Sequence, residues 1–173
     1  MPLLNPAAPN FSDPLGLLAA CHERMLGFCD LLERLDPWIE EHGLDQDAND
    51  GARSILRYFN TAARLHHEDE ELDLFPMLSG DATLRPLVRR LQAEHRELEQ
   101  LWSALARELD GLLNGRHRQA ELHAAVAPFC YAYRRHIRDE ENHILPQAKA
   151  RLSEAQLRTL GASMRARRQS DGK

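Results

Sequence analysis

Two copies of one histidine–glutamate pattern are the residues in this sequence whose types and spacing could do chemistry. The first copy pairs His66 with Glu70, and the second pairs His136 with Glu140. On a helix, a spacing of four residues places the imidazole and the carboxylate on one face, about one turn apart. Imidazole and carboxylate together suit iron, manganese or zinc. Two such pairs could therefore share a metal site.

Two further histidines occupy matching positions in an internal repeat. A shift of 70 residues superimposes the two histidine–glutamate patterns, and a shift of 73 residues places His22 on His95. Each half of the chain thus supplies one lone histidine and one histidine–glutamate pair, as expected for a site near a pseudo-twofold axis at the centre of a helical bundle. The predicted metal ligands are His22, His66, Glu70, His95, His136 and Glu140.

A second pairing in the first copy has the same spacing, because His67 precedes Glu71 by four residues. The repeat decides between the two pairings, since His67 corresponds to Ile137, which cannot bind a metal. The acidic neighbours of the motif are interpreted as a solvated face: Glu68, Asp69 and Glu71.

The predicted ligands lie on stripes that otherwise consist of apolar residues. Burying an unpaired carboxylate costs several kcal/mol, so two glutamates that converge on a core need compensation, and a pair of metal ions supplies it. Coordination positions left free would bind a small ligand, as in reactive metal sites. A different interpretation stays open, in which the histidines belong to a helical interaction domain and respond only to pH.

Helical periodicity runs through most of the chain and positions these residues. A first helix begins after Asp13-Pro14, with Pro37 as a possible kink or end and Gly43 as its stop, and a polar linker follows from Asp45 to Asp50. The second helix is expected to end near Pro76. The third is expected to span about Leu84 to Leu113, and the fourth roughly Gln119 to Leu145. A capping box at Ser153 opens a short final helix before a basic, polar tail. The predicted fold is all-α, an up-down-up-down four-helix bundle with a short C-terminal helix.

Composition places the chain among globular domains. It has 173 residues, 43% of them hydrophobic and 28% charged. We expect an irregular N-terminal arm over residues 1–12, the bundle over 13–150, and the short helix with its tail over 151–173. The net charge of -5 argues against nucleic acid as a partner. We expect no membrane span, a cytoplasmic location, and three free thiols at Cys21, Cys29 and Cys130.

The order of these motifs resembles the hemerythrin-like, HHE cation-binding family, over roughly residues 13–150. The resemblance is carried by His22, His66 to Glu70 with Leu74-Phe75-Pro76, Glu94-His95, and His136 to Glu140 with Ile144-Leu145-Pro146. It implies a four-helix bundle around a non-haem di-iron centre with an oxo or hydroxo bridge, with manganese or zinc as alternatives. Such a centre would bind oxygen, or related molecules such as nitric oxide and peroxide.

The chain departs from the oxygen-carrying hemerythrins in two ways. Those proteins place two histidines one turn apart on the third helix, whereas here His95 has Leu91 before it and Glu99 after it at that spacing. Their fourth helix supplies an aspartate five residues after its histidine, whereas Glu140 comes four after His136. The resemblance therefore favours the bacterial regulatory or protective branch over reversible oxygen carriage. Glu99 and His143 stay open as additional ligands.

Two functions are compatible with this site. The first is a binding module that senses or buffers oxygen, nitric oxide, peroxide or iron in a stress-response or regulatory role, with a protein partner for its output. The second is a di-iron enzyme that acts on hydrogen peroxide or ferrous iron, in a catalase-like or ferroxidase-like reaction. An enzyme would need a proton donor near the metals, and Tyr133 is the candidate.

Overall fold

Capping residues mark both ends of the first long helix. The computed structural model describes residues 10–116 and 118–171, so most of the predicted N-terminal arm lies outside the described residues. Helix α1 spans Pro14–His42, and the Asp13 side chain accepts a hydrogen bond from the Gly16 amide at its start. Gly43 ends the helix with φ 74°, a left-handed conformation that suits glycine. Pro37 lies inside α1 and does not end it.

The second leg of the bundle is built from consecutive helical segments. They are α2 (Gln46–Asn60), α3 (Ala62–Asp69), the π-helical turn η1 (Glu70–Leu74) and α4 (Phe75–Ser79). The prediction of a polar linker from Asp45 to Asp50 was wrong, because α2 begins at Gln46. Asp45 is its N-cap, and its carboxylate accepts from the Ala48 amide at 2.8 Å.

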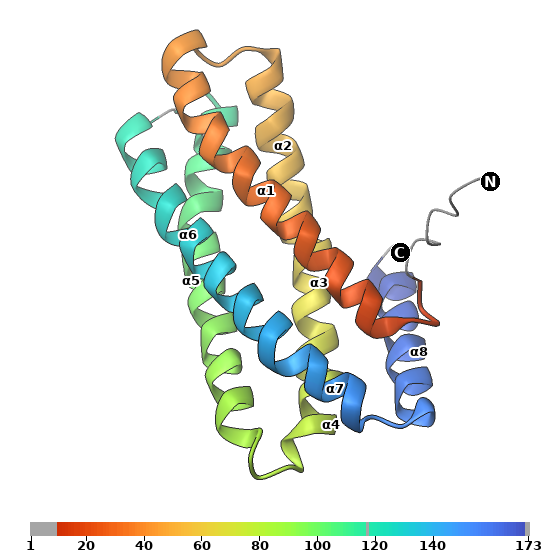
Figure 1. Cartoon of the computed structure of the whole chain (residues 1–173). Coiled ribbons are helices and arrows are strands. Elements are labelled where there is room, and N and C mark those ends of the chain that lie inside the picture. The colour runs from red at the N-terminus through yellow and green to blue at the C-terminus, as the bar shows by residue number, and fades with distance from the viewer. Residues whose placement is uncertain (1–9, 117, 172–173) are drawn as a thin grey trace, which may run out of the picture.

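The third and fourth legs complete an up-down-up-down bundle. The third is α5 (Arg85–Leu113); the fourth consists of α6 (Gln119–Asp139), the π-helical turn η2 (Glu140–Ile144) and α7 (Leu145–Arg151). Figure 1 shows the four legs lying alongside one another, with α8 (Glu154–Asp171) packed outside them. Every regular element in the described ranges is a helix. The all-α four-helix bundle is therefore confirmed.

The two π-helical turns begin at the two glutamates among the predicted metal ligands. The Phe75 amide donates to the Glu70 carbonyl, and the Leu145 amide donates to the Glu140 carbonyl, which are bonds across five residues. In both copies a proline comes two residues after the last residue of the turn, at Pro76 and Pro146. A proline inside an α-helix clashes with the carbonyl four residues earlier, and a wider turn in front of it relieves that clash. The second leg therefore continues past Pro76 to Ser79 instead of breaking there.

Apolar side chains form two separate clusters along the bundle. One cluster contains Met25 and Leu98, and the other contains Leu18 and Leu91. His22 lies between Leu18 and Met25 in the sequence, and His95 lies between Leu91 and Leu98 in the same way. The lone histidines thus belong to a polar layer that separates two apolar parts of the core.

The C-terminal helix is longer than its sequence pattern suggests, because it continues through the basic residues to Asp171. The predicted capping box is present: the Ser153 hydroxyl accepts from the Gln156 amide at 3.2 Å, and the Gln156 side chain accepts from the Ser153 amide at 3.0 Å. Leu160 and Met164 are fully buried on the face that meets the bundle. At Gly161 the helix passes so close to Phe11 that an added Cβ would lie 2.0 Å from the Phe11 carbonyl oxygen.

Arginines at the end of α8 hold an acidic residue next to the first motif. Asp69 is 0% exposed, which corrects its interpretation as a solvated residue. Its carboxylate is paired with Arg167 and, at 2.7 Å, with Arg168. Arg167 also contacts Asp73 at 2.6 Å. The basic residues therefore neutralise a buried carboxylate and are not a solvated tail.

Within the described ranges, none of the helices has both the length and the apolar character that crossing a lipid bilayer requires.

Replacing Arg167 with alanine should destabilise the fold through Asp69. The buried carboxylate would keep only Arg168, so we expect the free energy of unfolding to fall by about 2 kcal/mol or more. Urea denaturation measures this change. The matched control is Arg158→Ala, because Arg158 pairs with Glu154 on an exposed part of the same helix. Equal losses in the two variants would show that the Asp69 pair contributes no more than a surface ion pair.

Candidate metal centre

All six predicted ligands lie in the polar layer between the two apolar clusters. Each is at most 3% exposed, although they come from four different legs of the bundle. The helical spacing of four residues brings each glutamate beside its own histidine, and the packing of the legs brings the lone histidines to them. The residues are His22, His66, Glu70, His95, His136 and Glu140.

His22 and His66 form one half of this cluster. Their Nε2 atoms lie 3.1 Å apart. Glu70 Oε1 is 3.2 Å from the Nε2 atom of His66, and Glu140 Oε2 is 3.2 Å from the Nε2 atom of His22. Four donor atoms therefore surround one point, two of them imidazole nitrogens and two of them carboxylate oxygens.

His95 and His136 form the other half in the same way. Their Nε2 atoms lie 3.0 Å apart. Here the other oxygen of each carboxylate is used: Glu70 Oε2 is 3.3 Å from the Nε2 atom of His95, and Glu140 Oε1 is 3.2 Å from the Nε2 atom of His136. Each glutamate thus directs one oxygen to each histidine pair, so its carboxylate would be able to contact an ion in either half.

The donor set fits two metal ions. Ions held by bonds of about 2.1 Å separate neighbouring donors by roughly 3 Å, close to the spacings in both halves. Within the described part of the chain, Glu70 Oε2 and both oxygens of Glu140 are buried without a hydrogen bond of normal geometry. Such oxygens are costly unless a cation lies beside them.

Three further carboxylates orient the histidines from outside. The Nδ1 atom of His22 contacts Glu141 at 2.7 Å, that of His95 contacts Glu71 at 2.8 Å, and that of His136 contacts Glu94 at 3.0 Å. An imidazole that donates from Nδ1 presents the lone pair of Nε2 to the centre, as metal-binding histidines do.

These outer carboxylates were missed or misread in the sequence, although the repeat contained the signal. Glu71 and Glu141 superimpose under the shift of 70 residues, which marked them as equivalent. Glu71 was interpreted as solvated; it is half-buried and bonded to His95 instead. Helical periodicity could not reveal this contact, because it joins η1 to α5.

His66 has a different neighbour from the other three histidines. Under the shift of 73 residues, Cys21 takes the position of Glu94. Burial lowers the pKa of His66, but the charge of Glu70 and a contact with the Cys21 thiol raise it to about 9. The two halves of the centre are therefore alike in their inner donors and unlike in their outer ones.

The histidines and glutamates of the cluster shift one another's pKa values in the directions that keep both charged. Burial disfavours the charged forms, yet Glu140 and Glu70 raise the pKa of His22 to about 11, and Glu70 and Glu71 raise the pKa of His95 to about 10. Burial also raises the pKa of Glu70, but His66, His22 and His95 hold that pKa well below its usual range. In the absence of metal, protons on the histidines balance the carboxylates.

His67 lies closer to the centre than the repeat suggested. Its ring stacks on His95 with centroids 4.2 Å apart, and its donor atom is within 4.8 Å of those of His95 and His136. Its Nε2 atom is 3.4 Å from the Tyr133 hydroxyl. Burial and the neighbouring His95 lower the pKa of His67 well below its ordinary value, so this ring is neutral. His67 is thus a third imidazole at the half of the centre that holds His95 and His136.

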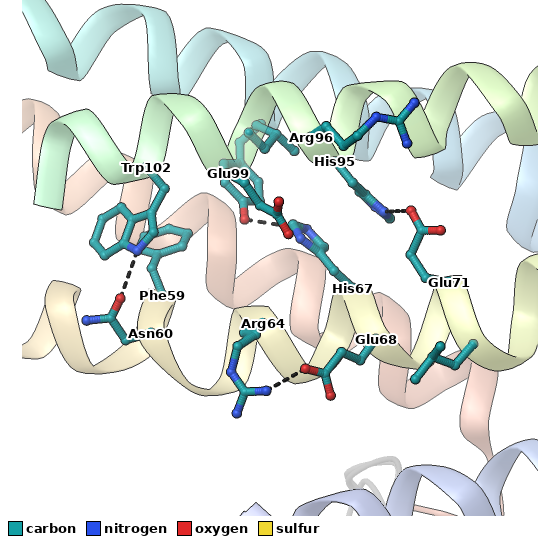
Figure 2. A pocket seen from close by; sticks show the side chains of 13 residues that line it. Phe59, Asn60, Arg64, His67, Glu68, Glu71, His95, Arg96, Glu99 and Trp102 are labelled. Carbon is teal, nitrogen blue, oxygen red and sulfur yellow. Dashed lines mark hydrogen bonds and ion pairs between the residues drawn. The ribbon is translucent and has the colours of Figure 1, made fainter.

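The remaining candidates lie away from the inner donors. His143 is exposed and contacts the Asp139 carbonyl at 3.0 Å. The π-helical turn at Glu140 changes the register after it, so the spacing from Glu140 no longer places His143 on the inner face. Glu99 is exposed and lines a cavity beside His67 and His95. Figure 2 shows this cavity, with the contact between His95 and Glu71 at one side.

Metal binding should release protons from the chain. At pH 7 the raised pKa values keep His22, His66 and His95 protonated in the metal-free chain, so binding should release roughly three protons. Their protonation stabilises the metal-free fold below a pH of about 6.5, and this stabilisation is lost as the pH rises through 9 to 11. Metal affinity should accordingly rise with pH. Zinc titration in weakly buffered solution with a pH indicator measures the release; binding without it would mean that the histidines start neutral.

Comparison with known proteins agrees with this geometry. A family model described as the hemerythrin HHE cation binding domain matches residues 13–148. An uncharacterized protein of Haemophilus influenzae is 36% identical over 160 residues, which cover 92% of this chain and 92% of the relative. The chain therefore belongs to the hemerythrin family of HHE cation-binding domains.

Proposed function

We propose that this chain is a non-haem di-iron protein that binds or senses oxygen, nitric oxide, peroxide or iron in a regulatory or stress-response role. The supporting observation is the position of the carboxylate oxygens of Glu70 and Glu140. Each carboxylate has one oxygen next to the pair of His22 and His66 and its other oxygen next to the pair of His95 and His136. Two ferrous ions bound there would supply electrons to a small oxidant and open positions to hold it.

A route for a small ligand supports the same proposal. A cavity of about 640 Å³ lies against His95 and His67. His95 is itself only 3% exposed, so a ligand that comes from the cavity leaves bulk water before it reaches the centre. The apolar side chains of Phe59, Leu98 and Trp102, which line another part of the cavity, reduce the water that can accompany the ligand.

The metal content of Glu70→Ala tests the ligand assignment. The chain should bind about two irons, and the variant should hold less than about one, because each half loses a carboxylate oxygen. Elemental analysis of protein purified without a histidine tag measures this. The control is Glu68→Ala, since Glu68 pairs with Arg64 on the outer face of the same helix. Full iron content in Glu70→Ala would remove Glu70 from the ligand set.

A contact next to the centre favours the enzyme as a second candidate. The Tyr133 hydroxyl is buried and lies 3.4 Å from His67, which in turn stacks on His95. Burial raises the pKa of Tyr133 well above its ordinary value, so the hydroxyl keeps its proton. A protonated hydroxyl and a neutral imidazole in contact can deliver a proton to a molecule held beside them.

Stopped-flow spectra of the reduced, iron-loaded chain distinguish the two functions. A lasting absorption band with oxygen supports a binding module, whereas sustained consumption of hydrogen peroxide supports an enzyme. In the second case, Tyr133→Phe should slow turnover by about a hundredfold, because it removes the proton donor and keeps the ring. Tyr58→Phe is the control, since the Tyr58 hydroxyl donates to the Cys21 carbonyl and does not contact His67. Unchanged turnover in Tyr133→Phe would exclude Tyr133 as the donor.

A further inference from the structure

The cavity beside His95 is far larger than oxygen, nitric oxide or hydrogen peroxide requires. Its volume of about 640 Å³ falls in the range of pockets that hold organic ligands, roughly 300 to 1,000 Å³. It opens between the second and third legs of the bundle (Figure 2), and Tyr133 of the fourth leg completes its wall. The size of the cavity needs an explanation beyond passage of a diatomic molecule.

One end of the cavity is apolar and aromatic. Phe59, Leu98 and Tyr133 are each at most 4% exposed, and Trp102 lies against Phe59 with ring centroids 4.9 Å apart. The Trp102 indole donates to the Asn60 side chain at 2.9 Å, which holds the ring in place. Rigid aromatic walls of this kind bind the apolar body of a small molecule.

The other end carries the polar groups. The Tyr133 hydroxyl and His67 Nε2 are 3.4 Å apart, a loose contact that leaves both able to bind a further polar atom. The same His67 ring stacks on His95. A polar head bound by Tyr133 and His67 would therefore lie against the His95 half of the centre.

The charges around the cavity disfavour an anion. Two arginines, Arg64 and Arg96, face three carboxylates, those of Glu68, Glu71 and Glu99. Arg64 is paired with Glu68, and Glu71 accepts from His95 and Gln92. These arginines and carboxylates thus offer no net positive charge to an anion, which suits a neutral ligand better than a carboxylate or a phosphate.

These features belong to one half of the repeat. The residues equivalent to His67, Trp102 and Glu99 are Ile137, Cys29 and Leu26. Ile137 and Cys29 are buried in the apolar core, and Leu26 packs against it. Three of the side chains that line the cavity therefore depart from the internal symmetry of the chain.

We propose that this cavity binds a neutral organic hydroperoxide, with its apolar body against Phe59, Leu98 and Trp102 and its O–O group between Tyr133 and His67. This inference rests on the proposed function, because it names the class of peroxide that the centre would meet. The apolar body would select organic hydroperoxides over hydrogen peroxide through burial of apolar area.

Binding can be measured without any redox reaction by using a stable alcohol with the same body as a hydroperoxide. The probe is 2-phenyl-2-propanol, added to the full chain loaded with redox-inert zinc. The chain has two tryptophans, so Trp38→Phe leaves Trp102, in the cavity wall, as the reporter. We expect saturable quenching of Trp102 fluorescence, and weaker binding of benzoate, the charged aromatic probe.

Variants locate the probe. Leu98→Phe fills the apolar end and should weaken binding by more than about tenfold, or 1.4 kcal/mol. Tyr133→Phe removes one hydrogen bond to the head and should weaken it by about fivefold. Tyr58→Phe, a second buried tyrosine outside the cavity, should leave binding unchanged. Thermal unfolding checks that each variant is folded, and Tyr133→Phe still tests the inference if Leu98→Phe is not.

Quenching that fails to saturate, or that is equal in the Leu98→Phe and Tyr133→Phe variants and the parent, would overturn the inference. So would tighter binding of benzoate than of the alcohol. The proposed function is scored separately, by iron content and by reaction with oxygen or peroxide. A chain that binds the alcohol but holds no iron would count against the di-iron assignment and leave the cavity as an organic binding site.

Discussion

Two buried carboxylates facing each other require cations between them, and the rest of this structure follows from that requirement. Glu70 and Glu140 come from different legs of the bundle and are at most 1% exposed. Without compensation, each would cost several kcal/mol or take up a proton. The four inner histidines provide the compensation as imidazolium in the metal-free chain, and bound cations would provide it in their place. The same buried groups thus connect the stability of the core to its capacity to bind a cation.

The positions of these carboxylates depend on a local departure from the α-helix. Each glutamate opens a π-helical turn, and a proline follows each turn. π-Helical turns are frequent at functional sites because they re-aim side chains that a regular helix would place elsewhere. Here the turn accommodates the proline and takes His143 away from the inner face. The sequences Leu74-Phe75-Pro76 and Ile144-Leu145-Pro146 therefore help to position the glutamates.

A second layer of charge surrounds the centre. Carboxylates bond the outer nitrogens of three histidines, and Arg167 and Arg168 of α8 neutralise Asp69 directly before Glu70. The C-terminal helix is thus coupled to the first motif through a buried ion pair. The outer layer is also where the two halves differ, at Cys21 against Glu94 and at His67 against Ile137. These differences make the halves of a nearly symmetric centre chemically unequal.

The sequence by itself determined the helical class, the two-hairpin repeat and the identity of the six inner side chains. It could do so because helical periodicity is local, and because duplication displays the same pattern twice. Contacts between legs were decided only by the tertiary structure: the partners of Glu71 and Glu141, the burial of Asp69 beneath α8, and the approach of His67 to His95. The sequence pattern also did not predict the two π-helical turns, because regular helical periodicity assumes the same spacing of backbone hydrogen bonds throughout a helix. The sequence shows which side chains share a face of one helix, whereas the partners of those side chains on another helix depend on how the helices pack.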